Sequence, residues 1–219
     1  MLNTIILIVA AALLSGLLFF EKQGNSRLVL PVKTVLSCFF ILTAIVQPHT
    51  LPGYHRLILI GLIFCLGGDV FLALPQKKMF LLGLVSFLVG HVFYVAAFMN
   101  VTGMNGFAVV GSLLTIGVSA GVYMWLKPHL GTMKVPVIFY IVVISGMLCS
   151  AWAILGESEL AKQGRLLVFI GALSFYVSDL FVARDRFLKN EFLNRLIGLP
   201  LYYAGQFMLA FSVGLLHQI

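Results

Sequence analysis

The sequence predicts an all-α, polytopic helical membrane protein that crosses a membrane about eight times. Of its 219 residues, 61% are hydrophobic and only 10% are charged, and the mean hydropathy is +1.09. A water-soluble domain of this length leaves too much of its surface exposed to hide so much apolar material, so lipid must be its solvent. The apolar residues also form eight runs, each long enough for the roughly 20-residue helix that spans a bilayer.

Short breaks rich in Gly, Pro, Asn and charged residues separate the apolar runs, as expected for loops between helices. The first run has no basic segment before it and is long enough to span, which favours a retained helix over a cleaved signal peptide. Together the runs predict one transmembrane domain over residues 1–219. The predicted spans are residues 2–20, 28–46, 57–74, 79–99, 107–125, 135–155, 165–183 and 196–216.

Basic residues are distributed unequally between the two sides of these spans. One side would hold eleven Lys and Arg, Lys33 among them, and the other side three. The positive-inside rule then predicts that both termini lie on the non-cytoplasmic side. The membrane is expected to be the plasma membrane, which is the inner membrane in a bacterium. The formal net charge is +7, and the basic residues that produce it are expected in short loops that contact anionic lipid headgroups. No nucleic acid partner is expected. The basic stretch 184–189 is interpreted as a topology signal, with headgroup binding as the alternative.

A short pattern occurs twice in the chain. Residues 61–73 and 171–183 share Gly, Asp, Phe and Ala at a constant spacing of 110 residues, and Asp69 and Asp179 are the matched acids. This spacing is about half the chain and suggests two repeat halves, residues 1–106 and 107–219. An even number of spans in each half would make the repeat parallel. Chance agreement between two apolar segments is the alternative.

Asp69 and Asp179 are the two acids inside the predicted spans. An Asp near the centre of a spanning helix costs about 2.5–3.5 kcal/mol on insertion scales, so such residues are usually functional. At 1.5 Å rise per residue, both lie about 8–9 Å below the cytoplasmic boundary. Each acid alone could simply hydrogen-bond a neighbouring helix. Their shared depth favours a joint functional site.

Six further polar residues near these acids are candidates for substrate binding. His91 and Tyr94 share a helix face because they are three residues apart. The candidates in the last span lie about 10–16 Å below the same boundary. The alternatives are a core histidine without a ligand and tyrosines of the membrane interface. The six residues are His91, Tyr94, Ser178, Tyr202, Tyr203 and Gln206.

Two carboxyl groups that lie close together, as predicted for Asp69 and Asp179, indicate general acid–base catalysis. The sequence lacks a His-Glu-x-x-His motif and a Gly-rich phosphate loop, so no metal or cofactor is expected. Two nearby acids in a low dielectric cannot both ionise cheaply, so one would hold a proton beside the charge of the other. Such a pair suits cleavage through an oxocarbenium-like transition state, as in vinyl ether hydrolysis.

Two stretches resemble the signatures of the YhhN family of lysoplasmalogenase-like membrane proteins. They are Gly-Gly-Asp69-Val-Phe followed by Gly-His91-Val-Phe-Tyr94, and Ser178-Asp179 followed by Tyr202-Tyr203-Ala-Gly-Gln206.

The resemblance implies eight spans and hydrolysis of the vinyl ether bond of lysoplasmalogens, with Asp69 and Asp179 as the catalytic pair. The products would be a fatty aldehyde and glycerophosphoethanolamine or glycerophosphocholine. That bond lies just under the lipid headgroups, which is about the depth predicted for both acids. One competing hypothesis is a small proton-coupled transporter that uses the same acids. Another is a scaffold in which the acids are structural.

Overall fold

The computed structural model describes residues 1–218 and every side chain among them except that of Lys77. All of the long elements in this part of the chain are helices, and eight of them are long and apolar enough to cross a membrane. The predicted fold class is therefore confirmed, and the chain is an integral multi-pass membrane protein. The helices are α1 (Leu2–Gln23), α2 (Ser26–Val46), α3 (Pro52–Leu72), α4 (Lys77–Met99), α5 (Gly106–Leu126), α6 (Lys134–Leu155), α7 (Lys162–Phe187) and α8 (Phe192–Leu215), with two short 3-10 helices between α5 and α6, η1 (Lys127–His129) and η2 (Gly131–Met133).

The helix boundaries differ from the predicted spans mainly where polar residues extend a helix. α3 begins at Pro52 rather than at residue 57, because proline is well accommodated in a first helical turn. α7 continues to Phe187 rather than ending at residue 183, so its last turn carries Arg184 and Arg186. Basic residues are favourable there, at the negative end of the helix dipole. Gly24 ends α1 in a left-handed conformation with φ of 68°, which makes the α1–α2 turn very short.

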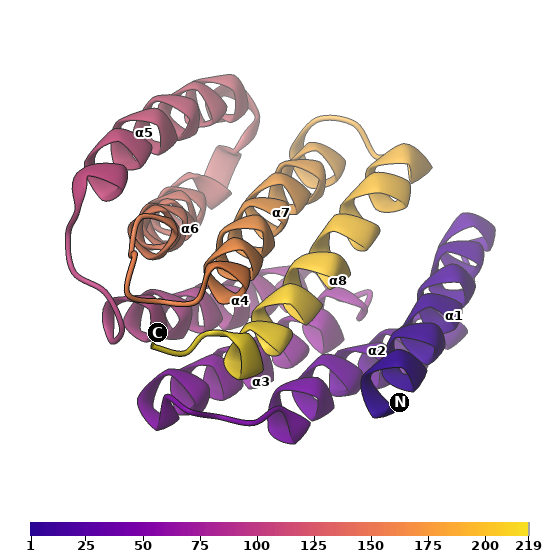
Figure 1. Cartoon of the computed structure of the whole chain (residues 1–219). Helices are drawn as coiled ribbons and strands as arrows, with labels where there is room; N and C mark the ends of the chain where they lie inside the picture. The colour runs from indigo at the N-terminus through magenta and orange to yellow at the C-terminus, as the bar shows by residue number, and fades with distance from the viewer. Residues whose placement is uncertain (219) are drawn as a thin grey trace.

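α8 lies at the centre of the bundle. It packs against α7 on one side and against α1, α2 and α3 on the other (Figure 1). α3 pairs with α4, α6 packs against α4 and α7, and α5 lies outside against α6. The two termini lie at the same end, where Gln47 Nε2 donates to Asn3 Oδ1 and Thr50 Oγ1 donates to the Leu216 carbonyl.

Glycines let two helix pairs cross with their backbones close together. At the α3–α4 crossing, a Cβ atom at Gly61 would lie 3.1 Å from the carbonyl oxygen of Gly90. At the α7–α8 crossing, a Cβ atom at Gly205 would lie 2.8 Å from the carbonyl oxygen of Gly171. Small residues are typical of such membrane helix pairs. The two crossings lie on corresponding helix pairs of the proposed halves, but only Gly61 and Gly171 match at the spacing of 110 residues, and the repeat itself stays a prediction.

We expect Gly205→Ala to destabilise the protein by about 1–3 kcal/mol, because the added methyl group pushes α8 away from α7. Gly117→Ala on α5 is the matched control, since its methyl group would meet no heavy atom within 4 Å. The measurement is the thermal unfolding midpoint of each purified variant in detergent. Equal midpoints for the two variants would contradict the close α7–α8 crossing.

Candidate active site

A cavity of about 480 Å³ lies inside the bundle, and all eight helices contribute side chains to its wall. Its volume is in the range of small-molecule binding sites. Asp69 from α3 and Asp179 from α7 both line it, so the structure brings the two predicted acids to one cavity. The wall formed by α5 and α6 is mainly apolar, and its side chains include Val122, Leu126, Val137, Ile141 and Ile144.

Asp69 is buried and surrounded by groups from α2 and α8. Lys33 Nζ lies 3.2 Å from Asp69 Oδ1, and the hydroxyls of Ser37 and Tyr202 each donate to Oδ2 at 2.6 Å. Lys33 and Ser37 share a helix face because they are four residues apart. Buried charges require paired, hydrogen-bonded surroundings of this kind. Each of these groups favours the ionised form of Asp69 and so offsets part of the cost of burying its charge.

The prediction that Lys33 belongs to a basic loop is wrong. Its side chain is only 10% exposed and is paired with Asp69 inside the bundle. A usable signal was present in the sequence. Lys33 lies five residues after the start of the predicted span 28–46, which is about 8 Å of depth at 1.5 Å per residue and close to the depth of Asp69. The basic side keeps ten Lys and Arg against three without it, so the predicted orientation does not depend on Lys33.

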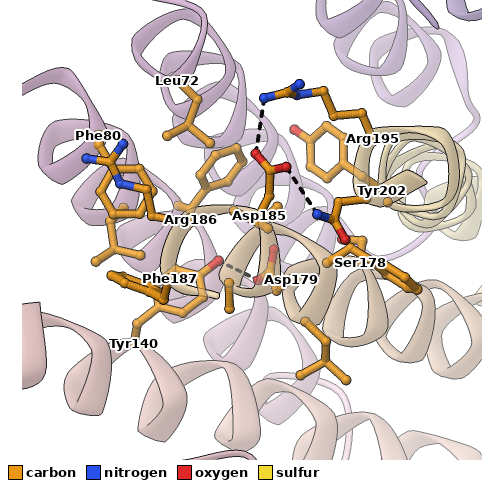
Figure 2. Close-up of a pocket in the computed structure, with 18 of the residues that line it drawn as sticks. Leu72, Phe80, Tyr140, Ser178, Asp179, Asp185, Arg186, Phe187, Arg195 and Tyr202 are labelled. Carbon is orange, nitrogen blue, oxygen red and sulfur yellow. Dashed lines mark hydrogen bonds and ion pairs between the residues drawn. The ribbon is translucent and has the colours of Figure 1, made fainter. Parts of the chain in front are cut away.

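Asp179 has simpler surroundings. The hydroxyl of Tyr140 on α6 donates to Asp179 Oδ2 at 2.6 Å, and Figure 2 shows the two side chains directed toward each other. Among the described residues, none of the five ion pairs includes Asp179. Tyr140 was not among the predicted site residues. It also lies five residues into its predicted span, 135–155, and so at about the same depth as the acids.

Four of the six predicted binding residues are associated with Asp69. Tyr202 lines the cavity and donates to Asp69, while Gln206 Nε2 donates to the Tyr202 hydroxyl at 3.3 Å. Behind them, the hydroxyl of Tyr94 donates to Gln206 Oε1 at 2.7 Å. The Tyr203 hydroxyl lies 3.4 Å from Ser37 Oγ. The result is a directed series of hydrogen bonds that ends on Asp69 and holds Tyr202 in place.

Ser178 precedes Asp179 on α7, and His91 packs against Tyr140, the hydrogen-bond partner of Asp179. Ser178 lines the cavity, but its hydroxyl donates to the Phe175 carbonyl at 2.8 Å. His91 is fully buried, and its Nδ1 lies 2.6 Å from the Phe87 carbonyl, so Nδ1 carries the proton. Its Nε2 has no hydrogen-bond partner within the described part of the chain. The His91 ring packs edge-on against two aromatic rings, with its centroid 4.5 Å from that of Phe175 and 5.5 Å from that of Tyr140. His91 therefore helps to hold the Tyr140 ring in place.

The loop between α7 and α8 is fixed by ion pairs at the rim of the cavity. Glu191 pairs with Lys189 and accepts from Arg184 Nη2 at 3.0 Å. The hydrogen bond from Lys189, with the charges of Lys189 and Arg184, holds the pKa of the Glu191 carboxyl below its ordinary value. Arg184 Nη1 also donates to Asn194 Oδ1, which orients that amide at the edge of the cavity.

The groups that face the cavity are suited to proton transfer and to stabilising positive charge. They comprise two carboxyl groups in unlike surroundings, the ammonium group of Lys33 and the hydroxyl of Tyr202. Across residues 1–218, no three His, Cys, Asp or Glu side chains come together in a way that could hold a metal ion.

The chain is similar in sequence to several proteins named lysoplasmalogenase. The protein named Lysoplasmalogenase TMEM86A of Bos taurus is 32% identical over 168 residues, which cover 74% of this chain and 67% of that protein. Lysoplasmalogenase TMEM86A of Homo sapiens is 31% identical over 194 residues, covering 83% of this chain and 78% of the relative. A Lysoplasmalogenase of Mycobacterium bovis is 27% identical over 190 residues, covering 84% and 68%. No solved structure matches the chain. The sequence profile of the YhhN family matches residues 28–213, and the chain therefore belongs to that family.

Proposed function

We propose that the protein is a membrane-embedded ether hydrolase that cleaves the vinyl ether bond of lysoplasmalogens. The products would be a fatty aldehyde and glycerophosphoethanolamine or glycerophosphocholine. The observation that carries the proposal is that Asp69 and Asp179 line one cavity in unlike surroundings. The relatives named lysoplasmalogenase support the choice of substrate.

The surroundings of the two acids support different roles for them. Asp69 has a neighbouring ammonium group and two hydroxyl donors, which favour the carboxylate. Asp179 has one neutral donor and no paired cation among the described residues, which favours the neutral acid. Tyr140 occupies Oδ2 of Asp179, so the proton would lie on Oδ1. We assign Asp179 as the proton donor and Asp69 as the anion that stabilises positive charge.

The reaction needs one proton and one water molecule. Asp179 protonates the second carbon of the alkenyl chain, and the electron pair of the double bond forms the new C–H bond. The positive charge is then shared by the first carbon and the ether oxygen, where the Asp69 carboxylate stabilises it. Water adds to the first carbon and gives a proton back to Asp179. The hemiacetal breaks its bond to the glycerol oxygen, which takes the hydroxyl proton, and the aldehyde leaves. The apolar wall of α5 and α6 would hold the alkenyl chain.

The test is to incubate the purified protein with 1-alkenyl glycerophosphocholine and glycerophosphoethanolamine and to read the products by mass spectrometry. We expect aldehyde from the alkenyl lipids and none from 1-alkyl or 1-acyl analogues. In D2O the aldehyde should carry one deuterium on its second carbon, with pre-formed aldehyde as the control for later exchange. Aldehyde without that deuterium would exclude protonation on carbon. Lipid uptake into proteoliposomes without any cleavage would instead indicate a transporter.

A further inference from the structure

The cavity has a charged mouth where α7 ends and α8 begins, beyond the two acids. Several charged and amide side chains from α1, α7, α8 and the loop between α7 and α8 line it. Asp185 and Arg186 follow Asp179 by six and seven residues on α7, which is a rise of about 9–10 Å along the helix. The mouth residues are Glu21, Asp185, Arg186, Asn190, Asn194 and Arg195.

Arg186 provides a positive charge at this mouth that is not neutralised by a carboxylate. Its guanidinium group lies over the ring of Phe80, 4.3 Å from the ring centroid. None of the five ion pairs formed by the described residues includes Arg186. A guanidinium stacked on an aromatic face keeps its N–H groups free at the edge, in a geometry that matches phosphate. Arg186 therefore presents phosphate-binding donors to the cavity.

The other part of the mouth has an excess of negative charge. Arg195 is shared by two carboxylates, because its Nη2 lies 3.1 Å from Asp185 Oδ2 and its Nε lies 3.4 Å from Glu21 Oε2. Two carboxylates against one guanidinium leave one negative charge in surplus. In Figure 2, the guanidinium group of Arg195 lies against the Asp185 carboxylate, whereas that of Arg186 lies away from it, beside Phe80. The unpaired positive charge and the surplus negative charge are thus separated across the mouth.

A separated positive and negative charge is complementary to a zwitterion. We infer that this mouth binds a phosphoethanolamine or phosphocholine headgroup, with the phosphodiester on Arg186 and the ammonium group facing Glu21 and Asp185. The rise along α7 from Asp179 to the mouth, about 9–10 Å, is comparable to the extended length of the seven bonds from the second alkenyl carbon to the phosphorus atom. The identity of the lipid rests on the proposed function, in which the vinyl ether lies at Asp179 and the headgroup lies beyond it.

The experiment measures binding of three ether lipids that contain no vinyl ether and cannot be cleaved. They are 1-O-alkyl-glycerophosphocholine, 1-O-alkylglycerol 3-phosphate and 1-O-alkylglycerol, each titrated into the full-length protein in a non-ionic detergent. Arg186→Gln should weaken both phosphate-containing lipids about tenfold and leave the alkylglycerol unchanged, because a charge-assisted hydrogen bond is lost. Glu21→Gln should weaken the phosphocholine lipid but not the phosphate-only lipid. The control is Arg27→Gln, which removes an exposed charge from the same end outside the cavity.

Two outcomes would overturn the headgroup site. One is an equal effect of Arg186→Gln and Arg27→Gln on all three lipids, which would show a general surface charge effect. The other is displacement of the phosphocholine lipid by inorganic phosphate as readily as by glycerophosphocholine, which would show a simple anion site. Arg186→Lys keeps the charge and should retain part of the affinity. Because these probes are not substrates, a failure to release aldehyde from lysoplasmalogens would leave the binding result unaffected.

Discussion

Asp179→Asn should lower the rate of aldehyde release from a lysoplasmalogen by about 10²–10⁴-fold, the usual contribution of a general acid. The amide has nearly the shape of the acid but cannot deliver a proton to carbon. Affinity for the non-cleavable alkyl lipid should stay close to that of the wild type, so the loss should appear in kcat and not in KM. The measurement is initial aldehyde release by mass spectrometry, alongside binding of the alkyl lipid.

Two further variants test whether the loss of activity in Asp179→Asn comes from the missing acid itself. Tyr140→Phe removes the hydrogen bond to Asp179 Oδ2 and leaves the acid in place, so we expect a smaller loss of about tenfold. Glu159→Gln changes an exposed acid outside this cavity and should have no effect. Turnover by Asp179→Asn at the wild-type rate would refute the assignment of Asp179 as proton donor.

Lys33→Met should destabilise the protein by about 3–5 kcal/mol, because it leaves the Asp69 carboxylate buried without its cation. The double variant Lys33→Met with Asp69→Asn removes both charges and should recover most of that stability. It should not recover aldehyde release, because the anion that stabilises the reacting cation is then absent. Unfolding in detergent gives the stability of each variant, and aldehyde release gives its activity.

Lys134→Met is the matched control for Lys33, since Lys134 is an exposed lysine at the first residue of α6 and outside the cavity. It should leave stability and activity unchanged. Aldehyde release by the double variant at the wild-type rate would show that Asp69 has only a structural role. A Lys33→Met variant as stable as Lys134→Met would contradict the buried ion pair.

Depth in the membrane could be predicted from the sequence, but the neighbours of each residue could not. Counting residues from the span ends placed Asp69 and Asp179 at one level, and both line one cavity. The same counting places Lys33 and Tyr140 at that level. Their roles as partners of the acids depend on how α2 and α6 are rotated and which helices they contact, and a single sequence does not contain that information.

His91 and Tyr94 also show that the sequence predicts the face of a helix but not which helices that face contacts. Their spacing predicted that they point to one side of α4, and their rings do lie 6.1 Å apart. Their partners nevertheless come from different helices. Tyr94 bonds to Gln206 on α8, and His91 packs against Phe175 on α7. Helix periodicity fixed the face of α4, but tertiary packing decided which acid each side chain supports.

Lys33 and Asp69 lie on consecutive helices, and α2 leaves the ribosome before α3. The lysine is therefore already present in the chain when the aspartate enters the bilayer, and the two residues can insert as a neutral ion pair. Tyr202, by contrast, belongs to the last helix to be synthesised. Charge neutralisation thus comes early in biogenesis, while the finished surroundings of Asp69 arise only when the whole chain has been inserted.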